Sequence, residues 1–374
     1  MNIDTKCVHA GGYHDTQTRG INTPIFTSSA YEYLDSETRL YQRYFNTPNQ
    51  EAVVKKICEL EGAEDGVVFS SGMAAISTSL LALLNSGDHA VVQDEIYGGS
   101  HAFIEDHFKR LGISFTFVRM DAQAIEDAIT SNTKIIYIES PTNPLLNVVD
   151  IRRIAEIGKR RGVLTVIDNT FATPINQNPF SLGIDVIIHS GTKYLGGHSD
   201  LYCGVAVTRK DIAARIRKTA ANFGGSLNAM SCYLLERSLK TLSIRVERQT
   251  QNALGIARFL EKHVEVERVN YPGLESHSGY KIASSQMSGF GAMLSFELKD
   301  TTAIDFMRRL RIIKPALSLG GVDTTICDPA TTSHQKVSGD VRKRLGISDN
   351  LLRLSVGIES VEDLIEDLQH ALEG

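Results

Sequence analysis

The sequence contains no tryptophan, no excess of basic charge and no long uninterrupted apolar run. Its net charge of −5 argues against the basic surface that nucleic-acid binding needs. The longest apolar stretches, such as residues 76–84, are interrupted by Ser and Thr and are too short to span a membrane. The first six residues carry no apolar signal core, so we expect a cytoplasmic protein that binds neither nucleic acid nor membrane.

The sequence also lacks the spacings that are typical of metal sites. The five cysteines, at positions 7, 58, 203, 232 and 327, form no Cys-x-x-Cys pair. The 11 histidines form no His-Glu-x-x-His pattern. We therefore predict reduced, mostly packed thiols and no metal ion.

What the sequence does contain is a repeated alternation of short apolar strands and helices. Expected strands lie at residues 66–69, 90–93, 114–118, 134–139, 164–168, 186–189 and 204–207. Continuous apolar strands separated by helices predict an α/β fold with a mainly parallel seven-stranded sheet covered on both faces. In such a sheet, ligands bind beyond the carboxyl ends of the strands.

The three parts of the chain differ in pattern. Residues 1–46 are polar and weakly periodic, and this pattern predicts an extended N-terminal arm. Residues 47–240 hold the alternating pattern. Residues 241–374 predict a smaller α+β domain that begins with a helix over 243–263, whose exposed face we expect to carry Arg245, Glu247 and Arg248.

Lys193 lies in the most informative segment, after the strand-like run 185–188 and among hydroxyls and glycines. A lysine that is partly buried can lose its proton and become the amine nucleophile of Schiff-base chemistry. The alternative is a lysine that merely caps the end of a strand. Taken alone, the segment favours that alternative.

Two further segments at strand ends suggest a bound anion and a bound cation. Ser70-Ser71-Gly72-Met73 follows a strand and begins a helix, a position that suits a phosphate or a simple helix cap. Asp168 ends an apolar strand and needs a cationic or hydrogen-bonding partner when buried. The protonated pyridine nitrogen of pyridoxal phosphate is such a partner, and a helix N-cap is the alternative.

Two loops at neighbouring strand ends carry the remaining polar candidates. Tyr97 lies on a glycine-rich turn, from which it could stack on an aromatic cofactor or simply face solvent. The prolines at 141 and 144 fix an irregular loop that directs Asn143 above the sheet, or forms a purely structural turn.

Taken together, these motifs resemble the Cys/Met-metabolism pyridoxal-phosphate enzymes, which include cystathionine synthases and lyases, methionine γ-lyase and homoserine sulfhydrylases. The resemblance runs almost end to end, through residues 9–12, 70–73, 139–144, 168–171, 189–194, 196–200 and 352–357. It implies the aspartate-aminotransferase-like fold (fold type I) and pyridoxal 5'-phosphate as cofactor.

The resemblance also implies roles for individual residues. Lys193 would bind the cofactor covalently and move protons, Asp168 would pair with the pyridine nitrogen, and Tyr97 would stack on the ring. The phosphate would be bound by Gly72, Met73, Ser190 and Thr192. The substrate would be held by Arg353 through its α-carboxylate and by Asn143 and Ser318.

The same resemblance implies an oligomer. Tyr41 and Arg43 match a Tyr-x-Arg element that reaches the phosphate of a neighbouring subunit. The implied assembly is a homodimer with shared active sites, usually two dimers per homotetramer. This arrangement accounts for an N-terminal arm that a lone subunit would bury poorly.

The chain departs from the family pattern at three positions. Asn46-Thr47-Pro48 replaces the usual Asn-Pro-Thr. Gly98-Gly99 replaces a turn that carries cysteine in methionine γ-lyases, which favours a cystathionine-type enzyme. Leu317 stands where cystathionine γ-synthases and γ-lyases carry glutamate, which favours a smaller or apolar thioether.

Because the last two departures conflict, the sequence leaves the substrate open. The leading hypothesis is a C–S lyase that releases a 2-oxo acid, ammonia and a thiol. The second is a transferase that carries out γ-replacement on an O-acylhomoserine. A non-catalytic protein that binds pyridoxal phosphate is the third.

Overall fold

The computed structural model describes residues 1–332, 342 and 346–374. Its larger sheet has the strand order β1-β7-β6-β5-β4-β2-β3, in which only β7 runs antiparallel to its neighbours. The strands are β1 (Asp65–Phe69), β2 (His89–Gln93), β3 (Ser114–Val118), β4 (Thr133–Glu139), β5 (Leu164–Asp168), β6 (Val186–His189) and β7 (Gly204–Thr208). Each predicted strand is present to within one residue, and the predicted fold class is confirmed.

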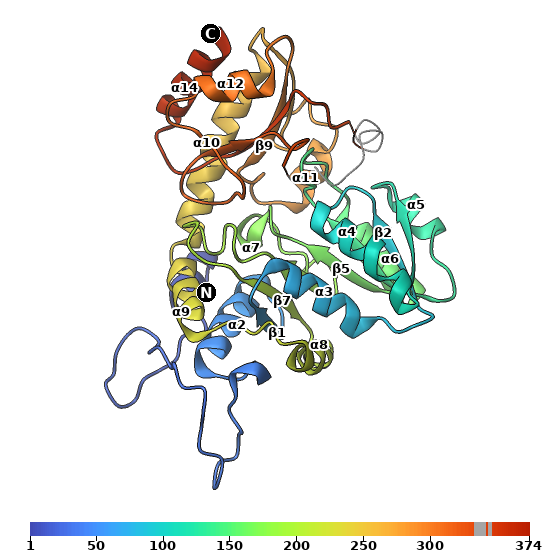
Figure 1. Cartoon of the computed structure of the whole chain (residues 1–374), viewed down its shortest axis with the longest axis vertical. Helices are drawn as coiled ribbons and strands as arrows, with labels where there is room; N and C mark the ends of the chain where they lie inside the picture. The colour runs from blue at the N-terminus through green and yellow to red at the C-terminus, as the bar shows by residue number, and fades with distance from the viewer. Residues whose placement is uncertain (333–341, 343–345) are drawn as a thin grey trace.

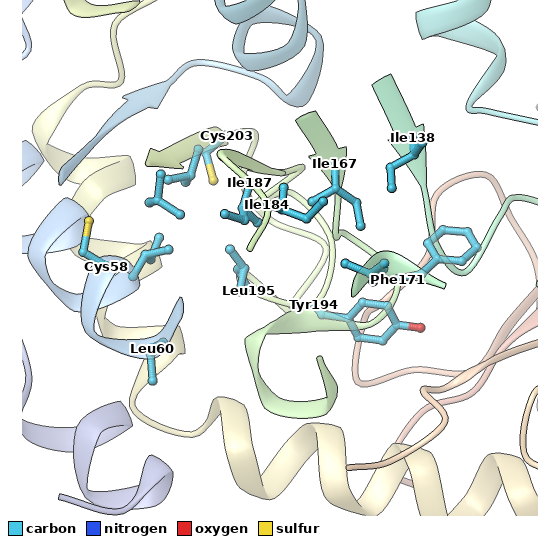
Figure 2. Packing of buried hydrophobic residues seen from close by; sticks show 14 of the residues in the cluster. Cys58, Leu60, Ile138, Ile167, Phe171, Ile184, Ile187, Tyr194, Leu195 and Cys203 are labelled. Carbon is cyan, nitrogen blue, oxygen red and sulfur yellow. The ribbon is translucent and has the colours of Figure 1, made fainter. Parts of the chain in front are cut away.

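Helices cover both faces of this sheet, as a mainly parallel sheet requires. One face packs against α2 (Pro48–Glu61), α5 (Ala122–Asp127), α6 (Ile151–Arg161) and α9 (Ala229–Leu239). The other face packs against α3 (Gly72–Leu83), α4 (Gly98–His107) and α8 (Lys210–Phe223). Figure 2 shows Ile138, Ile167 and Ile187, from three adjacent strands, gathered with Leu195 in the first of these two cores.

A second sheet follows the long helix α10 (Leu242–Glu261), which extends from the first sheet toward the second (Figure 1). Its strand order is β10-β11-β12-β9-β8. The strands are β8 (Val266–Asn270), β9 (Met293–Leu298), β10 (Lys314–Pro315), β11 (Thr325–Cys327) and β12 (Leu351–Ser355). Helices α12 (Ala303–Arg309) and α14 (Val361–Glu373) pack on its apolar core with α10. The described residues also form the short helices α7 (Thr173–Asn176), α11 (Tyr280–Gln286) and η2 (Lys109–Leu111).

The N-terminal segment is not wholly extended. It begins with α1 (Ile3–His9), which buries Cys7 and packs against α2 and α10. It ends with η1 (Gln42–Tyr44), and the chain between these helices projects from the body (Figure 1). The departure at Thr47-Pro48 is accommodated by a capping box, in which Thr47 and Gln50 cap the start of α2. The division of the chain after residues 46 and 240 stays a prediction.

One expectation about α10 is wrong. Arg245 is only 5% exposed, and its guanidinium donates to the carbonyl oxygens of Tyr194 and Ser238 at 2.9 Å each. The charge pattern misled because a buried arginine and a solvated one look alike in sequence. Through its hydrogen bond to the Tyr194 carbonyl oxygen, Arg245 stabilises the loop that follows Lys193.

All five cysteines are buried and unpaired. None of the helices in the described part of the chain combines the length and apolar character that crossing a membrane demands.

Candidate active site

A cavity of about 580 Å³ opens at the carboxyl ends of β4, β5 and β6, where sequence reasoning placed the ligand. It brings together residues that are up to 282 positions apart, from Ser71 to Arg353. The predicted site residues that line it are Gly72, Met73, Tyr97, Asn143, Asp168, Ser190, Thr192, Lys193, Leu317, Ser318 and Arg353.

Lys193 follows β6 and points its amine into this cavity. Nζ donates a hydrogen bond of 2.7 Å to Oγ of Ser318. Burial, assisted by the positive charge of Arg353, lowers the pKa of Lys193 from its ordinary value of 10.5 to about 8. The amine is therefore much closer to its neutral, nucleophilic form at physiological pH than an exposed lysine would be.

Arg353 lies on β12 and is 4% exposed. Its Nη1 donates to Oδ1 of Asn143 at 2.9 Å, and its Nη2 makes a long contact of 3.4 Å with the carbonyl oxygen of Ser318. Nε is buried and has no hydrogen-bond partner among the described residues. A buried guanidinium with an unsatisfied donor is suited to bind a carboxylate.

Asp168 is the last residue of β5 and is 7% exposed. Its Oδ1 accepts a hydrogen bond of 3.0 Å from the backbone N–H of Thr170. Burial raises the pKa of Asp168, and the Thr170 hydrogen bonds only partly oppose that shift. A cationic group bound beside this carboxylate would stabilise its charged form.

The start of α3 lies against the loop that precedes Lys193. Ser71 is the N-cap, and its Oγ accepts the N–H of Ala74 at 3.1 Å. A Cβ at Gly72 would lie 2.8 Å from Cβ and Oγ of Ser190, so only glycine allows this approach. The hydroxyl of Thr192 donates to the carbonyl of Cys203 at 3.2 Å and accepts its N–H at 3.0 Å.

Tyr97 precedes α4, and its side chain is 40% exposed at the cavity. A Cβ at Gly99 would lie 2.5 Å from Cε1 of the Tyr97 ring. Gly99 thus permits the position of this ring.

Tyr41 and Arg43 do not line the cavity of their own chain. Arg43 instead donates to the carbonyl of Ala221 and lies 5.6 Å and 5.5 Å from the ring centres of Tyr41 and Tyr44. A single chain therefore does not bring these two predicted residues into its own site.

Comparison with known proteins identifies the family. The Cys/Met metabolism PLP-dependent enzyme family matches residues 4–373. The chain belongs to this family. The protein is therefore a pyridoxal-phosphate-dependent enzyme of sulfur amino-acid metabolism, and the cofactor predicted from the motifs is confirmed.

Three relatives show how closely the chain follows the family. A cystathionine gamma-lyase of Bacillus subtilis is 43% identical over 100% of both chains. A cystathionine beta-lyase of Coxiella burnetii is 43% identical over 99% of this chain and 97% of its own. The crystal structure of cystathionine gamma-lyase from Lactobacillus plantarum, complexed with L-serine, superposes with a TM-score of 0.96 at 37% identity, covering 100% of this chain and 99% of that one.

The residues of the cavity fit the family's cofactor and an amino-acid substrate. Asp168 offers a buried carboxylate to a protonated ring nitrogen, and Lys193 offers an amine of lowered pKa to the aldehyde. The backbone N–H groups at the start of α3, where Gly72 approaches Ser190 closely, would suit the phosphate of the cofactor. The unsatisfied Nε of Arg353 fits a substrate carboxylate.

Tyr202 and Glu139 are two of the cavity residues that sequence reasoning did not single out. Tyr202 lines the cavity and is 77% exposed, although Leu201 and Cys203 on either side of it are buried. The alternation of side-chain directions just before β7 was the signal available for it. Glu139 ends β4 within a recognised motif, and only its contacts in three dimensions distinguish it.

Proposed function

We propose that this enzyme is a carbon–sulfur lyase that eliminates the sulfur substituent of a sulfur amino acid. The arrangement of Lys193 beside the Arg353–Asn143 pair carries the proposal. In this arrangement Lys193, whose pKa is lowered to about 8, would act as the base, and Arg353 would bind the α-carboxylate beside it. The full-length similarity to proteins named cystathionine gamma-lyase and cystathionine beta-lyase supports elimination as the reaction.

Substrate orientation follows from Arg353. A carboxylate that accepts from Nε and from the weakly engaged Nη2 displaces no strong hydrogen bond of the resting site. Asn143 holds Nη1, so the plane of the guanidinium is fixed before the substrate arrives. In this orientation the Cα–H bond of the substrate would face Lys193.

Proton transfer is assigned to Lys193 and Tyr97. Neutral Lys193 would remove the proton from Cα. For γ-elimination it would pass that proton on and then remove a second proton from Cβ, which lets the Cγ–S bond break. The Tyr97 hydroxyl would protonate the departing sulfur. Bound pyridoxal phosphate supplies an electron-withdrawing ring that accepts the electrons released at Cα. With water, γ-elimination from cystathionine yields cysteine, 2-oxobutanoate and ammonia, and β-elimination yields homocysteine, pyruvate and ammonia.

The mouth of the cavity favours apolar contact with the distal part of the substrate. Leu317 and Tyr202 line it and are 70% and 77% exposed. The carboxylates of described residues that line the cavity, Glu139 and Asp168, are both buried and already accept backbone N–H groups. A distal ammonium therefore finds no available carboxylate on this part of the chain, and methionine or homocysteine fits as well as cystathionine.

We further propose a homodimer in which Tyr41 and Arg43 of one copy complete the phosphate site of the other. Their absence from their own cavity and the projection of the preceding segment support this arrangement (Figure 1). Exposed apolar side chains on that segment, such as Ile21 at 97% and Leu34 at 75%, need a partner surface.

A substrate panel tests the proposed reaction. We expect purified enzyme to release a 2-oxo acid and a thiol from cystathionine, homocysteine or methionine without an added thiol acceptor. Lys193→Ala, which keeps the fold but lacks the amine, is the matched control and should be inactive. Rapid thioether formation from an O-acylhomoserine with no 2-oxo acid would establish the transferase instead. Bound cofactor without either activity would establish the non-catalytic alternative.

A further inference from the structure

Glu139 is a buried carboxylate that the roles described above do not use. It is the last residue of β4 and is 4% exposed. Its Oε2 accepts the backbone N–H of Tyr97 at 2.8 Å, and its Oε1 accepts the backbone N–H of Asn143 at 3.0 Å. One carboxylate thus joins two loops that come from different strand ends.

Both loops carry a residue of the candidate site. Tyr97 presents its ring to the cavity, and Asn143 accepts the hydrogen bond of 2.9 Å from Nη1 of Arg353. Arg353 in turn contacts the carbonyl oxygen of Ser318, whose hydroxyl accepts from Lys193. The hydrogen bonds therefore form a continuous series from the Tyr97 backbone through Glu139 to the residues proposed to hold the substrate.

The backbone of Glu139 is itself held firmly. Gln93, on the neighbouring strand β2, donates to the Glu139 carbonyl at 3.1 Å and accepts its N–H at 3.3 Å. On the other side, Glu139 pairs in register with Asp168 of β5. Glu139 therefore transmits the geometry of the central sheet to both loops.

This position is a costly one for a carboxylate. Burial raises the pKa of Glu139 well above its usual range, and the nearby Asp168 carboxylate raises it further. The N–H groups of Tyr97 and Asn143 and the charge of Arg353 act in the opposite direction. A glutamine would avoid the buried charge but has only one acceptor oxygen, and two N–H donors converge here.

We propose that Glu139 is a positioning residue that sets the Tyr97 ring and the Asn143–Arg353 carboxylate clamp in one fixed relation. The inference rests on the proposed function, because the role of Arg353 in binding the substrate carboxylate is part of that proposed function. Glu139 would affect how tightly the site binds a carboxylate and how that carboxylate is aligned with the Tyr97 ring.

A pair of ligands that cannot undergo elimination isolates this effect from turnover. L-norvaline has an α-carboxylate and no leaving group, and butylamine is the same molecule without the carboxylate. The affinity of the holoenzyme for each is measured from the change in cofactor absorbance. In Glu139→Gln we expect the ratio of norvaline to butylamine affinity to fall about fivefold to tenfold, because one N–H acceptor is lost and Asn143 shifts.

A double-mutant cycle separates positioning from a general loss of structure. Asn143→Ala should lower the same ratio, and Glu139→Gln added to it should lower the ratio no further, because both changes act on one clamp. Glu95→Gln is the matched control. Burial also raises the pKa of the Glu95 carboxylate, but this carboxylate accepts hydrogen bonds from the side chains of Thr142 and Asn147, both in the loop that carries Asn143. We expect its ratio to equal that of the wild type.

The cycle is repeated with Glu139→Asp, which keeps two acceptor oxygens on a shorter side chain, so that the test does not depend on the folding of one variant. We expect its ratio to lie between those of the wild type and Glu139→Gln. An unchanged ratio in Glu139→Gln, or additive effects with Asn143→Ala, would overturn the proposal. Because neither ligand can be eliminated, these outcomes are independent of whether the enzyme proves to be a lyase or a transferase.

Discussion

Lys193 and Ser318 are 125 residues apart in sequence, yet Nζ of the lysine donates a 2.7 Å hydrogen bond to the serine Oγ. Ser318 adopts a left-handed backbone conformation with φ of +78°, which is unfavourable for a residue with a side chain. The contact therefore joins a candidate nucleophile at the end of a strand of the larger sheet to a strained turn that precedes β11. Catalytic alignment depends on how these two parts of the chain pack.

Removing the Ser318 hydroxyl tests this contact. In Ser318→Ala we expect kcat to fall roughly fivefold to tenfold, because a hydrogen bond of about 1 kcal/mol no longer orients the amine. Ser318→Gly removes the same hydroxyl and also relieves the backbone strain, so it should match Ala in kcat but have a higher Tm. Steady-state kinetics and thermal unfolding measure the two effects. A wild-type kcat in both variants would show that the hydroxyl is dispensable.

The lowered pKa of Lys193 predicts a pH dependence in the protein freed of cofactor. Reaction of this amine with a lysine-modifying reagent should increase through a midpoint near pH 8, whereas exposed lysines increase near their ordinary value of 10.5. Between these two values the folded state has lost a proton that the unfolded state keeps, so the Lys193 contribution to stability rises with pH. Peptide mapping of the modified residue gives the midpoint.

Arg353 provides the control for that titration. Because its charge contributes to the shift, Arg353→Gln should move the Lys193 midpoint to higher pH. The shift should be partial, since burial is the larger cause. A midpoint that does not move would mean that the arginine charge is screened from the amine.

Gly99 is predicted to be required for the position of the Tyr97 ring. In Gly99→Ala the new Cβ would lie 2.5 Å from Cε1 of Tyr97, so the ring must move. We expect kcat/KM to fall about tenfold or more, in line with the cost of 1–3 kcal/mol for overpacking. Kinetics of Gly99→Ala in a Tyr97→Ala background supply the comparison. There the added methyl group should have little further effect, and an equally large loss would place its action elsewhere.

Leu317 is predicted to influence the choice of substrate. Leu317→Glu adds a carboxylate at the mouth of the cavity, where it can attract the distal ammonium of cystathionine. The ratio of kcat/KM for cystathionine to that for methionine should rise about fivefold, the size expected of a partly exposed charge pair. Leu317→Gln has the same shape as Leu317→Glu but no charge, and its ratio should be lower than that of Leu317→Glu. Equal ratios in the two variants would exclude a charge effect.

Mixed oligomers test the sharing of active sites. Lys193→Ala and Arg43→Ala inactivate different parts of one composite site if Arg43 acts on a second copy. Unfolding and refolding an equal mixture should restore about a quarter of wild-type activity, because half of the dimers then contain one intact site. Each variant refolded alone is the control. Activity no greater than the mean of the two controls would place Arg43 in its own subunit's site or outside any site.

The sequence by itself determined the fold class, the order of the strands along the chain and 11 of the 22 residues that line the cavity. It could do so because continuous apolar strands and polar residues at their ends are local patterns, and ligands of parallel sheets bind at those ends. Asp168 ends such a strand, and Lys193 and Tyr97 each lie in the loop that follows one. Their placement around one cavity needed only the rule that parallel strands end at the same edge.

Only the tertiary structure decided how those residues act on one another. Arg245 proved to be buried, and α1 proved to be helical, because packing against distant elements overrides local charge and periodicity. The lowered pKa of Lys193 arises from burial and from Arg353, on another sheet. Glu139 gained its proposed role from two N–H groups, 42 and 4 residues away, that no spacing rule brings to one carboxylate. Such properties depend on distances between segments that are far apart in the sequence, and these distances cannot be inferred from one sequence.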